Sequence, residues 1–285
     1  MNKKLHYPLA LANISDNEIE IACEQLRSRM TTMGAKVLEF EKSFSSFVGT
    51  EYSLMVNSGS SANLLIAYCL KIYLELNNDK RRHLIIPGIG WSTTYAPFIQ
   101  AGFEITIVDV DINTYNIDLD EAERLCRSDT VAIIAVNILG CPSKLQELND
   151  LCKNKDIYLI EDNCESMGAE LNKKKTGSYG IMSSHSFFFS HHINTMEGGM
   201  VSTENKELYV ILNLLRNHGW ARNIENLKKI IEKSSNSIAK ELKKIFNEVE
   251  TIDDYEFIKD FLFVFPAFNL RPTEIQGVLG VSQLK

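Results

Sequence analysis

Residues 145–162 carry the sequence LQELNDLCKNKDIYLIED, in which a helix leads directly into a strand. Apolar residues recur at helical spacing over 145–154. The apolar run at 157–160 is short, which is typical of a strand buried on both faces. It ends at Glu161 and Asp162, so two carboxylates close the strand. A helix followed at once by a buried strand is the unit of an α/β protein.

The same alternation extends through most of the chain. A polar turn is expected at 57–61, and Pro87 with Gly88 ends a buried strand. The pattern predicts helices at 35–47 and 62–76 and strands at 52–56, 84–86, 105–108 and 131–138.

The amino-acid composition narrows the possible classes of protein. The chain has 285 residues, is 45% hydrophobic and 24% charged, and has a formal net charge of -7. These values are ordinary for a soluble globular protein and disfavour a nucleic-acid binder, which needs a basic face. We expect no signal peptide and no membrane span, because no apolar run is long enough. The six cysteines are dispersed without a C-x-x-C pair, which favours free thiols in a reducing cytoplasm.

The segment 224–250 differs in character from the rest. Its apolar residues space like one or two amphipathic helices with a basic outer face. We predict a solvated helical insertion over 224–260, with a partner-binding element as the alternative. The chain stops at Lys285 inside a helical pattern, so we expect a longer natural protein.

The turn formed by Ser58, Gly59, Ser60 and Ser61 lies between a predicted strand and a predicted helix. Such a junction presents backbone N–H groups and the positive end of a helix dipole to an anion. Hydroxyls add further donors. A plain helix N-cap uses the same residues, so both interpretations stay open for this turn alone.

Asp162 and Trp91 each follow a predicted buried strand. A carboxylate at the end of a strand either caps the loop or pairs with a cation such as a pyridinium nitrogen. An aromatic residue at such a loop either packs into the core or stacks on a ring. Neither residue alone decides between these roles.

Eight motifs taken in order resemble the DegT/DnrJ/EryC1/StrS sugar aminotransferase family. They cover nearly all of the chain and lie at residues 31–34, 57–63, 87–94, 108–111, 161–165, 186–199, 216–223 and 268–274. The resemblance implies a fold-type I pyridoxal-phosphate enzyme with a central, mostly parallel seven-stranded sheet flanked by helices. It further implies a large cofactor-binding domain over 1–223, and a small C-terminal domain of which 261–285 is only the start.

The resemblance also implies roles for particular residues. Cofactor binding falls to Gly59, Ser60, Ser61, Trp91, Asp162, Glu165, Ser186 and Asn269. Among these, Asp162 would pair with the ring nitrogen, and Asn269 would reach the cofactor phosphate of a neighbouring chain in a homodimer. Substrate binding falls to Thr31, Thr32, Met33, Gly34, His218 and Arg222.

The loop at 186–199 reads SFFFSHHINTMEGG and carries the departure that decides the expected activity. Counting back from Glu197 puts His191, rather than His192, where the family has its Schiff-base lysine. An imidazole cannot tether an aldehyde cofactor, but it can move protons near neutral pH. The resemblance is therefore to the histidine branch, whose members use pyridoxamine and pyridoxal phosphate with L-glutamate. They remove the 3-hydroxyl of a nucleotide-linked 4-keto-6-deoxyhexose for the dideoxysugars of lipopolysaccharide O-antigen.

Two alternatives remain from the sequence: an ordinary nucleotide-sugar aminotransferase, and a non-catalytic member in which His191 is a packed or relic residue. The first needs a lysine, and none occurs over 178–204. An iron–sulfur cluster, used in a related branch, is not expected because closely spaced cysteines are lacking. The nucleotide and the hexose configuration stay open.

Overall fold

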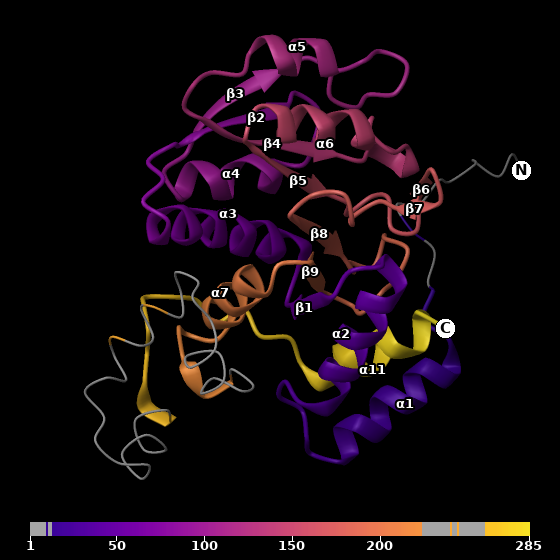
Figure 1. The fold of residues 1–285 in the computed structure, drawn as a ribbon. Helices are drawn as coiled ribbons and strands as arrows, with labels where there is room; N and C mark the ends of the chain where they lie inside the picture. Colours follow the sequence, from indigo (N-terminus) through magenta and orange to yellow (C-terminus); the bar gives the residue numbers. More distant parts are fainter. Residues whose placement is uncertain (1–9, 11–12, 224–239, 241–243, 245–259) are drawn as a thin grey trace, which may run out of the picture.

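A seven-stranded sheet forms the centre of the molecule, seen nearly edge-on in Figure 1. The structure is a computed structural model that describes residues 10, 13–223, 240, 244 and 260–285. The strand order across the sheet is β1-β9-β8-β5-β4-β2-β3. The strands are β1 (Tyr52–Val56), β2 (His83–Pro87), β3 (Glu104–Val108), β4 (Thr130–Val136), β5 (Tyr158–Asp162), β8 (Met182–Ser186) and β9 (Gly199–Thr203).

Most of the sheet is parallel. Strands β3, β2, β4, β5 and β8 run in one direction, and only β9 pairs antiparallel with both β8 and β1. The predicted seven-stranded, mostly parallel α/β sheet is therefore confirmed. Because parallel strands end at the same edge, the residues that follow β2, β4, β5 and β8 come together there.

Helices cover both faces of the sheet. One face carries α3 (Gly59–Leu76), α4 (Ser92–Gln100) and α7 (Lys206–Arg216), and the other carries α5 (Leu119–Arg124) and α6 (Leu145–Asn154) (Figure 1). The side chains of a strand alternate between the faces, so Leu84 and Ile86 join the first core and Ile85 the second. Double coverage explains why these strands are apolar throughout.

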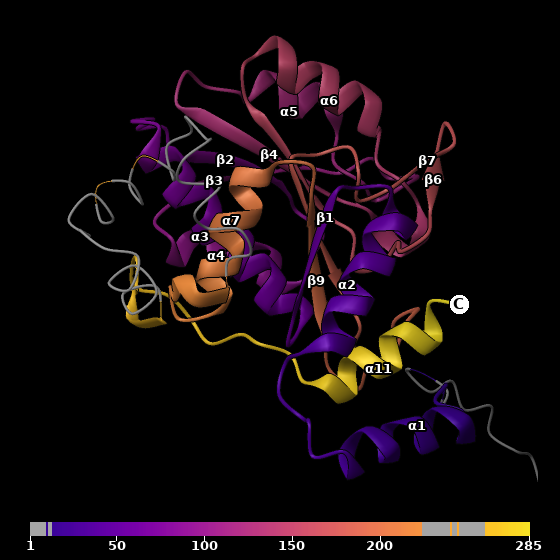
Figure 2. The ribbon, with the colours of Figure 1, turned by 60° about the horizontal axis from the view of Figure 1, so that its bottom comes forward.

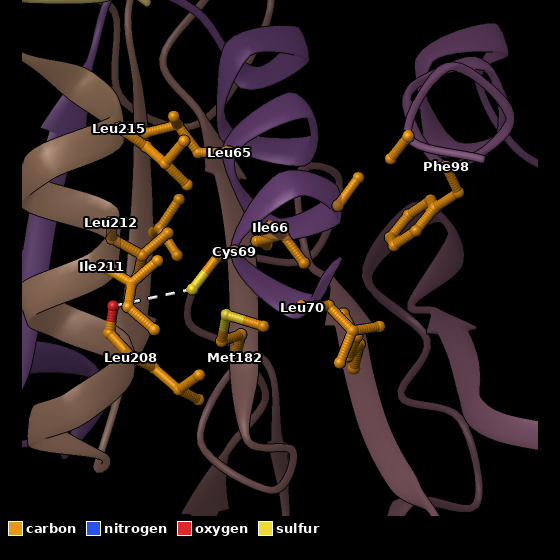
Figure 3. Packing of buried hydrophobic residues seen from close by; sticks show 14 of the residues in the cluster. Leu65, Ile66, Cys69, Leu70, Phe98, Met182, Leu208, Ile211, Leu212 and Leu215 are labelled. Carbon is orange, nitrogen blue, oxygen red and sulfur yellow. Dashed lines mark hydrogen bonds between the residues drawn. The ribbon is translucent and has the colours of Figure 1, made fainter. Parts of the chain in front are cut away.

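Helix α3 packs lengthwise against α7, and leucines fill the seam between them (Figure 3). Leu65 and Cys69 of α3 face the α7 side chains, and the Cys69 thiol lies 3.6 Å from the Leu208 carbonyl oxygen. This seam fixes the position of α3, whose first turn contributes to the cavity described below.

A third layer lies beside the antiparallel end of the sheet. It consists of α2 (Ala35–Val48), α11 (Glu274–Gln283) and α1 (Asp16–Arg27), with α11 lying between the other two (Figure 2). Phe40 and Phe44 of α2 pack on Phe187, just after β8. The buried pair of Glu41 and Arg216 joins α2 to α7, and both groups also bond the backbone of Met55.

Three of the differences between the predicted and observed element boundaries fall at the edge of the sheet where the cavity lies. Helix α3 begins at Gly59, so most of the expected turn at 57–61 is its first turn, capped by Ser58. Strand β4 ends at Val136 rather than residue 138, because residues 138–140 form a short 3-10 turn. Strand β5 runs through Asp162, so both carboxylates belong to the strand. The insertion predicted over 224–260 lies almost entirely outside the described residues.

Among the residues that the structure describes, no helix is both long and apolar enough to cross a membrane.

Glu41→Ala should destabilise the protein strongly, because it leaves the Arg216 guanidinium buried without its carboxylate. Removing one partner of a buried pair costs about 3–5 kcal/mol. Glu39→Ala, two residues away on α2, breaks only the exposed pair with Lys36 and should cost about 0–1 kcal/mol. Urea unfolding of both variants measures the difference, and equal losses would contradict the prediction.

Candidate active site

A cavity of about 430 Å³ lies at the carboxyl ends of β4, β5 and β8, between the first turns of α3 and α4. This is the edge where parallel α/β sheets commonly bind ligands. Its walls combine hydroxyl, carboxylate, aromatic and imidazole side chains. They are Ser58, Gly59, Ser60, Asn63, Trp91, Thr93, Thr94, Val136, Asp162, Cys164, Glu165, Ser186, Phe188, Ser190, His191 and Glu197.

The first turn of α3 forms one wall of the cavity. The Ser58 hydroxyl caps the helix by accepting the Ser61 backbone N–H at 3.0 Å, and it also donates to the Ser61 hydroxyl at 3.0 Å. Gly59 and Ser60 line the cavity, whereas Ser61 does not. The turn is thus an N-cap and also opens on the cavity, so the two interpretations of the sequence are compatible.

Two glycines allow the β8–β9 hairpin to lie against this turn. A methyl group on Gly59 would come within 2.6 Å of the Ser186 Cβ, and one on Gly199 within 2.3 Å of the Ser58 carbonyl oxygen. Only glycine fits contacts this close. The packing brings the Ser186 side chain beside the N-terminus of α3, where both can face an anion.

Asp162 forms the floor of the cavity at the end of β5 and is 5% exposed. Its Oδ2 accepts from the Asn63 amide at 2.9 Å and from the Thr94 hydroxyl at 2.7 Å. Its Oδ1 accepts the Cys164 backbone N–H at 3.2 Å. The carboxylate is therefore held by three separate segments of chain and oriented toward the cavity.

Trp91 forms an outer wall. It precedes α4 as the N-cap residue, and 72% of its surface is exposed. Of the two roles considered for this residue, packing into the core is excluded. Its ring is available to a ligand in the cavity.

His191 lies in the cavity wall, and its backbone N–H donates to the Phe188 carbonyl at 2.9 Å. Partial burial lowers the pKa of this imidazole below its ordinary value, while the negative charge of Glu165 opposes that shift. The shift favours the neutral ring, which is able to accept a proton. His192 is exposed and lies outside the cavity lining.

Glu165 lines the same cavity as His191, and a hydrogen bond from the loop after β4 holds its carboxylate. Its Oε2 accepts the backbone N–H of Leu139 at 3.1 Å. Leu139 follows β4 in the left-handed region, with φ of 48°. The loop after β4 therefore steers the Glu165 carboxylate.

The predicted substrate segment at 31–34 does not line this cavity, and the C-terminal helix holds it in place. The Glu274 carboxylate accepts the backbone N–H groups of Gly34 at 2.8 Å, Lys36 at 2.9 Å and Val37 at 3.0 Å. From the same turn of α11, Gln276 donates to the carbonyl of Glu197. One helical turn thus ties segment 31–34 to the loop that carries His191.

The remaining predicted residues, Asn269, His218 and Arg222, contact other groups outside the cavity lining. Arg271 links two of them, since its Nε donates to Asn269 Oδ1 at 2.9 Å and its Nη2 lies 3.4 Å from His218 Nε2. Arg222 pairs with Asp260 at 3.5 Å and lies over the Trp220 ring. None of these residues lines the cavity.

Sequence reasoning gave no role to Asn63, Thr93 or Thr94, although the motifs contained all three. Asn63 and Thr94 bond Asp162, and the Thr93 hydroxyl lies 3.0 Å from that of Ser60. In the sequence these three residues appear only as polar side chains near the starts of two largely apolar helices. That signal cannot show which residue of another segment they meet.

The sheet and its flanking helices form the aminotransferase fold, and the chain belongs to the DegT/DnrJ/EryC1/StrS aminotransferase family. The family model matches residues 12–285, which confirms the resemblance drawn from the motifs.

Among named relatives, the chain is 41% identical over 281 residues to the GDP-4-keto-6-deoxy-D-mannose 3-dehydratase of Yersinia pseudotuberculosis, covering 99% of this chain and 67% of the relative. A crystal structure of GDP-4-keto-6-deoxymannose-3-dehydratase, a histidine-to-asparagine variant with bound GDP-perosamine, matches with a TM-score of 0.86 and 40% identity. That match covers 98% of this chain and 68% of the other. The Escherichia coli enzyme with bound hydrated pyridoxal phosphate matches with a TM-score of 0.85 and 40% identity, over 98% of this chain and 67% of the other.

Glu165→Gln should lower the pKa of His191 further, because it removes the negative charge that stabilises the imidazolium and keeps an oxygen for the Leu139 N–H. The pH at which His191 gains its proton should therefore move down. NMR titration of the histidine ring signals measures it. Glu170→Gln, which removes a charge paired with Lys175 elsewhere, is the control and should leave His191 unchanged. An unchanged or higher pKa in Glu165→Gln would contradict the assigned cause.

Proposed function

We propose that this chain carries the catalytic site of a pyridoxal- and pyridoxamine-phosphate-dependent 3-dehydratase, which removes the 3-hydroxyl of a GDP-linked 4-keto-6-deoxyhexose. One observation carries the proposal: the imidazole of His191 shares the cavity with the carboxylate of Asp162, and the lining contains no lysine among the residues described. The names of the relatives support the choice of GDP and of the mannose configuration.

The cavity residues fit the cofactor. Gly59, Ser60 and Ser186 offer donors to its phosphate at a helix N-terminus. Asp162 offers a buried carboxylate to the ring nitrogen, and Trp91 offers an exposed aromatic face. Glu165, which also lines the cavity, would meet the ring hydroxyl. When bound, such a cofactor supplies an amine and an electron sink.

His191 is proposed as the acid–base residue. The neutral ring takes a proton from the reacting carbon and returns it later in the cycle. The 3-hydroxyl leaves as water, and the sugar product is a 3-deoxy-4-keto sugar. Loss of the 3-hydroxyl reduces the sugar by two electrons. The oxidation of L-glutamate to its 2-oxo acid supplies these electrons, and the glutamate nitrogen leaves as ammonia. Since His191 cannot form an imine, every contact to the cofactor is non-covalent.

Substrate contacts are proposed for two regions that lie outside the cavity lining. Thr31, Thr32, Met33 and Gly34 would line its entrance. His218 and Arg222 would meet the sugar or its diphosphate.

We further propose a homodimer. Asn269 does not line the cavity of its own chain, and its bond to Arg271 leaves the amide nitrogen able to donate. An Asn269 that serves the cofactor phosphate would then act on the neighbouring chain across a two-fold interface.

His191→Asn should lose about 10²–10⁴-fold in dehydration rate, the usual contribution of acid–base help, while it still binds the cofactor. His192→Asn is the matched control and should keep nearly the wild-type rate, because that ring is exposed. Stopped-flow measurement of 3-deoxy sugar formation with L-glutamate present gives both rates.

The opposite pattern, an active His191→Asn and an inactive His192→Asn, would move the base to His192. Absence of cofactor binding by the wild-type protein would instead favour a non-catalytic member of the family.

Mixing inactive His191→Asn and Asn269→Ala chains should restore about a quarter of the wild-type activity after subunit exchange, because half of the dimers then contain one intact site. Each single variant alone provides the baseline. No recovery despite exchange, followed by mass-tagged subunits, would mean that Asn269 serves its own chain or none.

A further inference from the structure

We infer that Thr94 and Asn63 are positioning residues that hold Asp162 oriented toward the ring nitrogen of the bound cofactor. The inference rests on the proposed function, since it assigns the supports of a carboxylate proposed to hold that nitrogen. It goes beyond the proposal by naming the donors and the oxygen that remains free.

Both donors reach the same oxygen from different helices. The Thr94 hydroxyl from α4 and the Asn63 amide from α3 bond Asp162 Oδ2 at 2.7 and 2.9 Å. Thr94 is 1% exposed and Asn63 is 5% exposed, so water cannot readily replace either one. Hydrogen bonds donated to a carboxylate stabilise its charged form.

The hydrogen bonds already made by the Asp162 carboxylate show which of its two oxygens a ligand can bond. A carboxylate has about four acceptor sites. Oδ2 uses its two for Asn63 and Thr94, and Oδ1 uses one for the Cys164 backbone N–H. Oδ1 is therefore the oxygen open to a ligand, although the Cys164 thiol also hydrogen-bonds the Asp162 side chain, and Asp162 lines the cavity. A protonated ring nitrogen in the cavity would complete the set.

The same two helices are joined by a second contact between residues that line the cavity. Ser60 of α3 and Thr93 of α4 have hydroxyls 3.0 Å apart. Ser60 and Asn63 are three residues apart and lie on one face of α3. The first turns of α3 and α4 therefore fix the distance between the anion-binding turn and Asp162.

Loss of the Thr94 hydroxyl should weaken the hold of Asp162 on a protonated nitrogen. Hydrogen bonds to charged groups are strong enough that one lost bond changes an equilibrium about tenfold. The ring nitrogen of the bound cofactor should then lose its proton about one pH unit lower.

The test is ¹⁵N NMR of pyridoxal phosphate labelled at the ring nitrogen and bound to the purified protein, followed across pH. Thr94→Val removes the hydroxyl with little change in shape, and Thr94→Ser returns it. We expect the titration to shift down in Thr94→Val and to recover in Thr94→Ser. Thr93→Val, the same change one residue away, should weaken binding without shifting the titration.

Three outcomes separate the inference from the proposal beneath it. A wild-type protein that binds no cofactor, or leaves its nitrogen unprotonated, overturns the proposed role of Asp162. A wild-type protonated nitrogen with an unchanged Thr94→Val titration overturns the inference alone. If Thr94→Val does not fold, Asn63→Leu carries the same expectation, and an unshifted titration there overturns the inference.

Discussion

The structure depends on the burial of two neighbouring carboxylates at the end of β5. Glu161 and Asp162 point to opposite faces, as consecutive strand residues must. Glu161 is fully buried, and it accepts backbone N–H groups from residues 177, 179 and 180 and the side-chain amide of Asn137. Burial raises the pKa of this carboxyl, and these bonds oppose the shift. Glu161 thus anchors the loop that leads into β8, while Asp162 faces the cavity.

Other parts of the chain are arranged around that edge by a few specific contacts. Gly59 and Gly199 allow the β8–β9 hairpin to reach the N-terminus of α3, which puts Ser186 beside Gly59. The first turn of α11 ties segment 31–34 and the loop of His191 together through Glu274 and Gln276. Residues more than 200 positions apart in sequence therefore share one framework.

The sequence predicted the fold well because its signals are local. Periodicity gave the helix at 145–154 to the residue, and the buried strands appeared as apolar runs because helices cover both faces. The start of α3 was missed, since Gly59, Ser60 and Ser61 have turn-forming composition yet are helical once Ser58 caps them. The roles of Asn63 and Thr94 could not be predicted, because each depends on a partner about 70 to 100 residues away. The cofactor role of Asn269 and the substrate role of His218 remain predictions.

We expect His191, at the position where the family has its lysine, to direct this chain to dehydration rather than amino transfer. Mass spectrometry of the product formed from GDP-4-keto-6-deoxymannose, with L-glutamate and the cofactor present, tests it most directly. We expect a sugar product lighter than the substrate by one oxygen atom, together with free ammonia. A product that keeps the 3-hydroxyl and carries an amine at the former keto position would contradict it.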